Sequence, residues 1–235
     1  MLTSTIIFIF ILLLVSVSVY ALGKLTLAGT ITGALTAISL YLGFLFAGLS
    51  LLGTFFILAT LATWWQKRVK AQTGNFKHPE KRNAYQVVAN GGIAAFFGLL
   101  NFYGFSYYNS FATLAAAALA SATADTLSSE MGTVYGKRFY NVITFKTDLN
   151  GRDGVISLEG TLIGIAGSVA IALVFSVSAG FSRHSIIILI AGTAGNLFDS
   201  VLGATLERKG YIKNNIVNFL NTAFAALLAY LILLI

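Results

Sequence analysis

Long apolar stretches alternate with short polar segments along the chain, and the apolar stretches have the length of membrane spans. The hydrocarbon core of a bilayer needs about 20 apolar residues in one helix, with a range of about 17–25. Two of the stretches are short or contain polar residues, so seven spans are also compatible with the pattern. The eight expected spans are residues 5–22, 25–43, 44–65, 85–102, 110–125, 155–180, 185–206 and 215–235. We therefore predict an all-α fold, a polytopic transmembrane helical bundle in which residues 1–235 form a single domain.

Composition agrees with this fold class. The 235 residues are 57% hydrophobic and only 10% charged, whereas about a quarter of the residues of a soluble domain are charged. The 23 glycines suit the close approach of helices in lipid, where small residues let backbones touch. Because the chain contains no cysteine, disulfides, thiolate nucleophiles and metal sites with cysteine ligands are excluded.

The distribution of basic residues favours eight spans over seven. With eight spans and the N-terminus outside, 14 of the 15 Lys and Arg residues fall on one side, and only Arg183 falls on the other. Basic loops stay in the cytoplasm, so we expect cytoplasmic loops at 66–84 and 126–154 and both termini on the opposite side. The positive charge is thereby explained by topology, and no nucleic-acid partner is expected. The acidic residues fall on the same side, which places any charged chemistry at the cytoplasmic face.

An internal repeat is suggested by two matching segments. "LTLAGTITG" (25–33) aligns without gaps to "ISLEGTLIG" (156–164), an offset of 131 residues. The same offset aligns Arg82, Asn83 and Asn90 with Lys213, Asn214 and Asn221. It pairs the second, third and fourth spans with the sixth, seventh and eighth in the same orientation, as in a parallel duplication. We predict a four-plus-four duplication with halves 1–110 and 111–235, with chance alignment of apolar helices as the alternative.

Polar side chains form stripes on three of the expected spans. Each stripe recurs at intervals of three or four residues, which places its members on one helical face. The stripes are Asn196, Asp199 and Ser200; Asn214, Asn218 and Asn221; and Asn83, Gln86 and Asn90. Because lipid cannot satisfy polar groups, the stripes must face a shared interior. They form either a functional site or interhelical hydrogen bonds that hold the bundle together.

Two carboxylates stand at the end of the fifth span, in "SATADTLSSEMG" (121–132). A carboxylate within a span costs about 2.5–3.5 kcal/mol on insertion scales, so it indicates function or a specific partner. Asp125 and Glu130 are five residues apart, about 140° on a continuous helix, and would not share a face. We expect Asp125 to face Asp199 and Glu130 to belong to the loop that carries Lys137. A purely structural pairing of Asp125 with a nearby cation is the alternative.

The segment that follows has the composition of a phosphate site. Lys137, Lys146 and Arg152 supply positive charge, and "GRDGVISLEGT" leads into a helix start that includes Gly160 and Thr161. Free N–H groups at a helix N-terminus bind anions. Aspartates provide the hard oxygen ligands that suit Mg²⁺, which leaves its other positions to phosphates and water. No Walker-type glycine-rich motif is present, so a soluble-type P-loop kinase is excluded. The combination suits phosphoryl transfer to a lipid-borne group.

At these residues the chain resembles the integral-membrane phytyl-phosphate kinases of the vitamin E and phytol-salvage pathway. These enzymes belong to a broader family known as domain of unknown function ninety-two. The matching pieces are "SATADTLSSEMG", "YGKRFYNVITFK", "DGVISLEGTLIG", "GNLFDSVLGATLERKG" and "NNIVNFLNT", in the family's order. After "TFK" this chain has "TDLNGRDG" where the family has a basic, proline-containing stretch, which affects the expected lipid acceptor more than the expected reaction.

The resemblance implies a CTP-dependent, Mg²⁺-requiring membrane kinase that converts a prenyl monophosphate, such as phytyl or geranylgeranyl phosphate, to the diphosphate. It implies that Asp125 and Asp199 are catalytic metal ligands and that Lys137, also catalytic, and Lys146 contact the nucleotide phosphates. Glu130 would be a further ligand or an orienting residue. The other expected binding residues are Ser129, Asn90, Asn196, Asn214, Asn218, Asn221, Gly160 and Thr161.

Two other functions share many of these residue requirements. A membrane cytidylyltransferase would join CMP to a lipid phosphate and release diphosphate. A small-solute transporter would also have duplicated halves and acids within spans, but its site would lie near the bilayer midplane. Because the acids of this chain fall at span ends on one side, the pattern favours an enzyme. Prenyl chain length, nucleotide preference and oligomeric state are left open.

Overall fold

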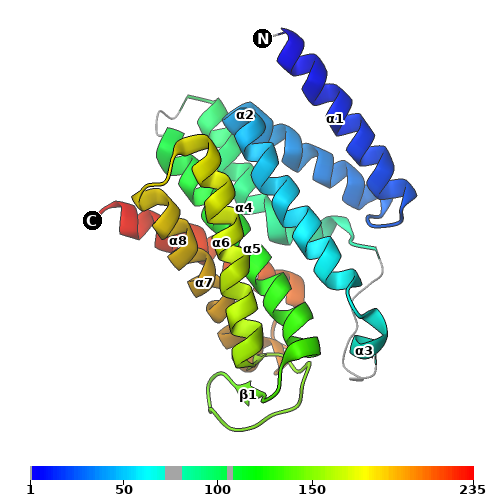
Figure 1. Cartoon of the computed structure of the whole chain (residues 1–235), viewed down its shortest axis with the longest axis vertical. Helices are drawn as coiled ribbons and strands as arrows, with labels where there is room; N and C mark the ends of the chain where they lie inside the picture. The colour runs from blue at the N-terminus through cyan, green and yellow to red at the C-terminus, as the bar shows by residue number, and fades with distance from the viewer. Residues whose placement is uncertain (1, 72–80, 105–107) are drawn as a thin grey trace.

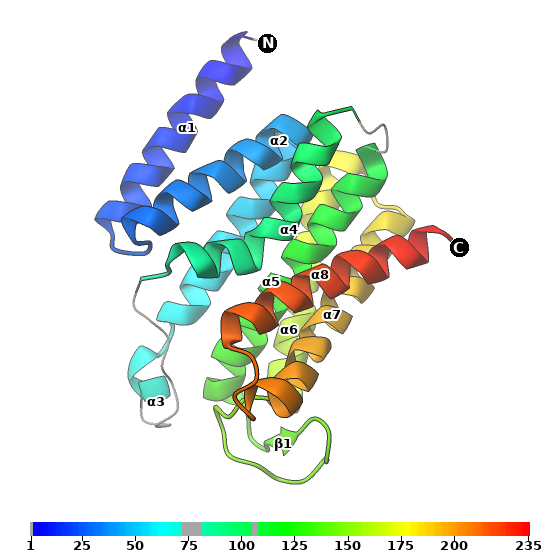
Figure 2. The same cartoon turned by 180° about the vertical axis from the view of Figure 1, so that it is seen from behind.

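Long helices make up most of the chain in the computed structural model, which describes residues 2–71, 81–104 and 108–235. The long helices are α1 (Leu2–Ala21), α2 (Leu27–Trp64), α4 (Ala84–Phe102), α5 (Tyr108–Tyr135), α6 (Leu158–Ala179), α7 (Arg183–Leu202) and α8 (Asn214–Leu233). The short elements are α3 (Lys67–Ala71), β1 (Tyr140–Asn141), β2 (Val155–Ile156) and a π-helical turn, η1 (Gly203–Glu207). Figures 1 and 2 show a helical bundle with one small hairpin at its end. The fold is the all-α polytopic bundle that the apolar pattern predicts.

Helix α2 is two spans joined by a sharp reversal. Leu45 has φ 54° and ψ −139°, a conformation that leucine rarely adopts and that no helix contains. The chain folds back at this residue, and the two arms of α2 diverge from it as a V in both views (Figures 1 and 2). With the arms counted separately, the described residues cross the bundle eight times, which confirms the predicted number of spans and the division between 25–43 and 44–65.

The two ends of the bundle differ in chemistry. Both chain termini lie at one end, and the segments around 22–26, 65–71, 81–83, 136–157 and 203–213 lie at the other, which we call the loop end (Figures 1 and 2). Among the described residues, every Lys and Arg except Arg183 belongs to the loop end. The predicted segregation of charge is therefore present in the structure. That the loop end faces the cytoplasm stays a prediction.

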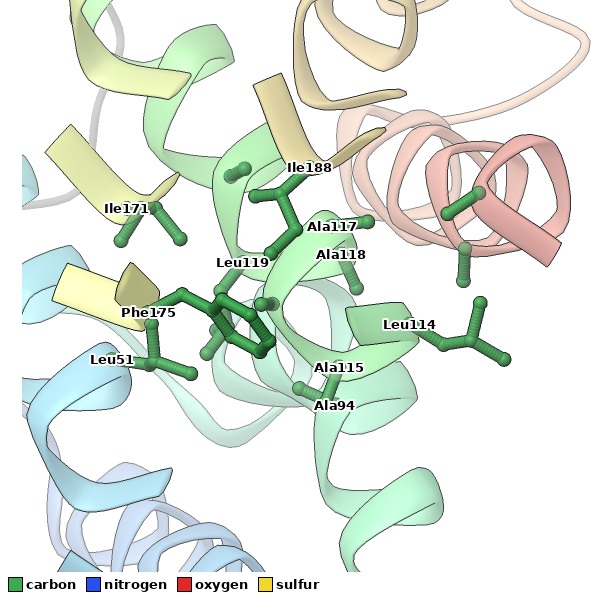
Figure 3. Close-up of a cluster of buried hydrophobic side chains, with 14 of the residues drawn as sticks. Leu51, Ala94, Leu114, Ala115, Ala117, Ala118, Leu119, Ile171, Phe175 and Ile188 are labelled. Atoms are coloured by element: carbon green, nitrogen blue, oxygen red, sulfur yellow. The ribbon is translucent and has the colours of Figure 1, made fainter. Parts of the chain in front are cut away.

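The structure also explains why the span at 110–125 looks polar. Five described helices are long and apolar enough to cross a membrane, namely α1, α2, α6, α7 continued into η1, and α8. Helix α5 is not among them, because it is enclosed by α2, α4, α6, α7 and α8 and touches little lipid. Its residues 112–124 are all buried. Figure 3 shows its alanines surrounded by apolar side chains of neighbouring helices, such as Ile171, Phe175 and Ile188.

Small residues allow the neighbouring helices to approach α5 closely. A methyl group at Gly192 of α7 would lie 2.6 Å from the Cβ of Ala120 and 2.8 Å from the Oγ of Ser168. The same packing recurs between α2 and α4, where a methyl group at Gly98 would lie 2.5 Å from the carbonyl oxygen of Ser39. Packing in this bundle therefore depends on backbone contact rather than on interlocking large side chains.

Two predicted boundaries at the loop end were wrong. Helix α5 continues to Tyr135 instead of ending near 125, so the loop between α5 and α6 covers 136–157 rather than 126–154. The polar residues of this last part stay helical because they find partners there, such as Asn196 for Ser128 and Lys70 for Glu130. The predicted loop at 66–84 contains the helical turn α3, and its residues 72–80 lie outside the described ranges.

The repeated segments begin helices in the same way. Thr26 and Ser157, which are 131 residues apart, are the N-caps of α2 and α6. Each side-chain oxygen accepts a hydrogen bond from the N–H of a glycine three residues later, Gly29 at 3.0 Å and Gly160 at 3.1 Å. The match in local geometry extends the match in sequence. The duplication of the whole chain stays a prediction.

The close contact of α2 and α4 leads to a first prediction. Replacing Gly98 with alanine should lower the free energy of unfolding by roughly 1–3 kcal/mol, because the added methyl group overlaps the backbone at Ser39. Gly53→Ala is the matched control, since no neighbouring atom lies within 4 Å of the added carbon. Thermal unfolding of the two purified variants in detergent measures the difference. Equal stability of Gly98→Ala and wild type would contradict the close packing.

Candidate functional site

A cavity of about 590 Å³ opens at the loop end of the bundle, within the size range of about 300–1,000 Å³ that small-molecule sites occupy. Its walls come from the ends of α2 and α7, the starts of α4, α6 and α8, the last turns of α5 and the 136–157 loop. The acids and amides that line it are Asp125, Glu130, Asp153, Asp199, Glu207, Asn83, Gln86, Asn90, Asn150, Asn196, Asn214, Asn215 and Asn218. The three polar stripes thus meet at one site, as a shared interior requires.

Asp125 of α5 and Asp199 of α7 face each other across this cavity. Their carboxyl groups are close enough to interact electrostatically. Asn221 of α8 donates a 2.6 Å hydrogen bond to Oδ2 of Asp199, and Ser121 of α5 donates a 3.1 Å bond to Oδ1 of Asn221. Asn221 is fully buried and does not line the cavity, so it holds Asp199 from behind. Two carboxylates this close cannot both be ionised unless a proton or a cation lies between them.

The donor set around these carboxylates fits Mg²⁺. Among the described residues, no group of three or more His, Cys, Asp or Glu side chains could hold a metal ion alone. The side-chain oxygens of Asn90, Asn150 and Asn218, which line the cavity, are buried and have no hydrogen-bond partner. Magnesium binds proteins through one or two carboxylates and takes its remaining ligands from phosphates, other oxygens and water. Asp125 and Asp199, with nearby amide oxygens, match that requirement.

The start of α6 forms part of the wall of the same cavity. Gly160 and Thr161 line it, but their N–H groups already donate to the side-chain and carbonyl oxygens of Ser157. Ser157 caps the helix, and the close contact of Gly160 with Gly132 of α5 leaves no room for a side chain, since an added carbon would lie 3.1 Å from the Cα of Gly132. Asn214 and Asn218 of α8 and Asn196 of α7 line the adjacent wall.

The structure does not bring the two predicted nucleotide lysines into the cavity. Lys137 and Lys146 are exposed on the 136–157 loop, and neither lines the cavity. The cations that do line it are Lys24, Arg82 and Arg152. Of these, Arg82 had a signal in the sequence, because it aligns with Lys213 in the repeat, and Lys24 immediately precedes the repeated segment. Contact of Lys137 and Lys146 with a nucleotide stays a prediction.

Glu130 has a different place from the one expected. It lies on α5, not in the loop, and its carboxylate forms a buried ion pair of 2.7 Å with Nζ of Lys70 in α3. Lys70 also donates a 2.6 Å hydrogen bond to the carbonyl oxygen of Ala62, near the end of α2. Lys70 was expected only as one of the basic residues of the loop end, but its side chain is almost fully buried. Glu130 and Ser129 both line the cavity edge.

Ion pairs of Asp148 connect the 136–157 loop to Arg208, which directly follows η1. Arg208 donates a 2.7 Å hydrogen bond to one carboxylate oxygen of Asp148, and Arg152 lies 3.3 Å from the other. Arg208 also donates to the carbonyl oxygen of Asp153 through Nε at 3.1 Å. The hydrogen bond from Arg208 lowers the pKa of Asp148 to about 2. Among the described residues, the ion-pair partner of Arg208 is therefore Asp148 and not Asp125.

These features define a polytopic membrane protein with an acidic, amide-rich cavity at one end of its helical bundle. The chain belongs to the integral membrane protein DUF92 family, whose model matches residues 10–226. The uncharacterized membrane protein MJ0933 of Methanocaldococcus jannaschii is 34% identical over 193 residues, which cover 80% of this chain and 76% of that protein. Protein VTE6, chloroplastic, of Arabidopsis thaliana is 30% identical over 193 residues, and the match covers 79% of this chain but only 58% of VTE6. Protein PGR of the same plant is 26% identical over 226 residues, 84% of this chain and 78% of PGR. No solved structure matches the chain.

Breaking the ion pair between Lys70 and Glu130 gives a second prediction. Glu130→Gln should destabilise the protein by about 3–5 kcal/mol, because it leaves a buried ammonium group without its counter-ion. The double variant Lys70→Met with Glu130→Gln should recover much of this loss, since no buried charge remains. Thermal unfolding of both single variants and the double variant provides the cycle. Simple additivity of the single effects would contradict the pairing.

Asp148 gives a third prediction, on pH. Because its pKa is lower in the folded protein than its ordinary value of 3.8, its contribution to stability is complete above that value and is lost as the pH falls toward about 2. Backbone hydrogen exchange in the 136–157 loop, corrected for intrinsic rates, should therefore accelerate over this interval. Asp148→Asn should show fast loop exchange already at neutral pH and no such transition. A transition retained in Asp148→Asn would assign it to another group.

Proposed function

We propose that this protein is a membrane phosphotransferase that transfers the terminal phosphoryl group of CTP to a prenyl monophosphate and forms the prenyl diphosphate. The observation that carries the proposal is the facing pair of Asp125 and Asp199 in a cavity that also presents unpartnered amide oxygens and three cations. The family membership and the resemblance to phytyl-phosphate kinases support the same reaction. The likeness to VTE6 supports it at the level of the family, since the match covers 58% of that protein.

In this reaction an oxygen of the prenyl monophosphate attacks the γ-phosphorus of the nucleotide. The bond between the γ-phosphorus and the bridging oxygen breaks, and CDP leaves with the bonding electrons. The attacking phosphate is already ionised at neutral pH, so a strong general base is not required. Positioning and charge neutralisation supply most of the catalysis in such transfers.

The chain's residues provide both contributions. Asp125 and Asp199 would hold Mg²⁺, which would neutralise charge on the transferred group when bound. Asn221 keeps the Asp199 carboxylate in place from behind. The amide groups of Asn214 and Asn218 would donate to phosphate oxygens of the nucleotide, and Arg82 and Lys24 would attract a second anion.

The place of the site favours an enzyme over a carrier. A carrier needs a site near the bilayer midplane that is reachable from both sides. Here the described acids are at the loop end, and the middle of the bundle around α5 is filled by alanine, leucine, isoleucine and phenylalanine (Figure 3). A closed apolar centre separates the cavity from the end that carries the termini.

One assay separates the three candidate functions. Purified protein in detergent is incubated with Mg²⁺, CTP labelled at the γ-phosphate, and phytyl or geranylgeranyl phosphate. Labelled prenyl diphosphate together with CDP supports the proposal. Release of diphosphate with formation of a CDP-lipid would instead identify a cytidylyltransferase. Absence of turnover with every lipid phosphate and nucleotide would refute both enzymes and favour a carrier.

The aspartate pair gives a fourth prediction. Asp125→Asn and Asp199→Asn should each reduce turnover by about 10²-fold or more, the effect of losing a group that stabilises transition-state charge. Each variant should be as stable as wild type or more stable, because removing one carboxylate relieves the repulsion between two facing acids. Turnover and thermal unfolding are measured on the same preparations. Glu159→Gln, which removes an acid that does not line the cavity, is the control and should stay active. Wild-type activity in either aspartate variant would remove that residue from the site.

A further inference from the structure

A second cavity lies beside the first and has the opposite character. It encloses about 230 Å³ between α1, the two arms of α2 and α4. Its walls are mostly apolar side chains, including Phe8, Leu12 and Val15 of α1 and Leu52, Phe55 and Phe56 of α2. We call it the tail pocket. It is not part of the polar site described above.

The tail pocket and the polar cavity meet at the start of α4. Arg82, Gln86 and Asn90 line both of them. This junction is rigid, because the side chain of Asn83 accepts from the N–H of Gln86 at 3.1 Å while the side chain of Gln86 accepts from the N–H of Asn83 at 2.9 Å. The apolar walls of one cavity therefore join the polar walls of the other at these three residues.

The charges at the junction select an anion. Among the described residues, Arg82 has no ion-pair partner within 4 Å, and its Nη2 donates to the hydroxyl of Thr63 at 3.3 Å. Lys24 is adjacent, since the N–H of Arg82 donates to the carbonyl oxygen of Lys24 at 3.0 Å. Its ammonium group lies 4.6 Å from the centre of the Trp64 ring. Two cations beside an apolar pocket suit a molecule with a hydrocarbon chain and an anionic head.

We propose that the tail pocket binds the hydrocarbon chain of the prenyl monophosphate acceptor, with its phosphate at Arg82 and Lys24 and directed toward Asp125 and Asp199. The inference rests on the proposed function for the identity of the acceptor. The unpartnered oxygen of Asn90 lies at the boundary, where a polar ligand or its bound cation would satisfy it. The pocket holds part of a long chain, and the remainder leaves along α1, whose outer face is largely exposed and apolar.

The two substrates then reach the site by different routes. The acceptor enters sideways from the bilayer between α1 and the arms of α2. The nucleotide enters from the loop end, beside the 136–157 loop and the N-termini of α6 and α8. Neither substrate has to pass the other, and the acceptor's head reaches the aspartates from the α4 side.

Gly53 provides the test, which is the fifth prediction. It lines the tail pocket, and a carbon added to it would have no neighbouring atom within 4 Å. Gly53→Phe should therefore fill the pocket without disturbing the bundle. We expect it to raise the KM for geranylgeranyl phosphate about tenfold, the change expected when roughly two methylene groups lose their burial. The kcat and the KM for CTP should change little, and turnover of dimethylallyl phosphate, which has no long chain, should be unaffected.

Ser50→Phe is the matched control, because Ser50 is exposed on the same arm of α2 and lies outside the tail pocket. It should leave the KM for both acceptors unchanged. An equal KM for geranylgeranyl phosphate in Gly53→Phe and wild type would overturn the inference. So would a loss of activity that is the same for short and long acceptors, provided that thermal unfolding shows both variants to be folded.

A binding experiment separates this inference from the proposed function. Wild-type protein in detergent is irradiated with a prenyl monophosphate that carries a diazirine on its chain, and labelled peptides are identified by mass spectrometry. Labelling of α1, α2 and α4 that falls in Gly53→Phe supports the tail pocket even if no turnover occurs. Turnover with labelling elsewhere, or no labelling above background, overturns the tail pocket. Equal competition by phosphatidylcholine and geranylgeranyl phosphate would also overturn it, since the pocket would then hold ordinary bilayer lipid.

Discussion

The enclosure of α5 by five other helices is the constraint on which the rest of the structure depends. A helix surrounded on all sides must be narrow, which explains the run of alanines at 115–118 and the glycines of α7 that meet its backbone. Because α5 also has little contact with lipid, it can contain hydroxyl and carboxylate side chains at depths where a lipid-facing helix could not. The same feature that makes α5 a poor membrane span by hydropathy makes it the helix that can carry Asp125.

The polar cavity lies where the enclosure of α5 by its neighbours ends. In the last turns of α5 the neighbouring helices begin or finish, and polar side chains replace alanine: Asp125 meets Asp199, Ser128 meets Asn196, and Glu130 meets Lys70. The three contacts differ in kind. The contacts of Ser128 and Glu130 join a donor to an acceptor and stabilise the bundle. Asp125 and Asp199 are two neighbouring acids, an arrangement that is unfavourable without a cation or a proton between them. Residues whose arrangement lowers the stability of the folded protein are commonly functional.

From the sequence we predicted the number of spans, the location of the charged residues at one end of the bundle and the meeting of the three polar stripes. These features follow from hydrophobicity and helical periodicity. The sequence did not predict that α5 continues to Tyr135, since the stabilising partners of that stretch lie about 60–70 residues away in the chain and leave no local pattern. It named Arg152 among the cations of the site but missed Lys24 and Arg82, which also line the cavity. Periodicity shows which face of a helix is polar, but a loop residue such as Lys137 has no face, and its distance from the site depends on how the loop folds.

The repeated helix starts give the site two walls, one suited to each substrate of the proposed reaction. At one wall, Lys24 and Arg82 lie next to the capped starts of α2 and α4. At the other, Gly160 and Asn214 lie at the starts of α6 and α8, in the segments that the 131-residue offset relates to the first pair. The first wall continues into the tail pocket, so that wall suits a lipid. The second wall opens beside the 136–157 loop and suits a water-soluble phosphate. Asp125 and Asp199 come from α5 and α7, so a cation that they hold would stand where the two phosphate groups meet, and it would offset the repulsion both between the acids and between the phosphates.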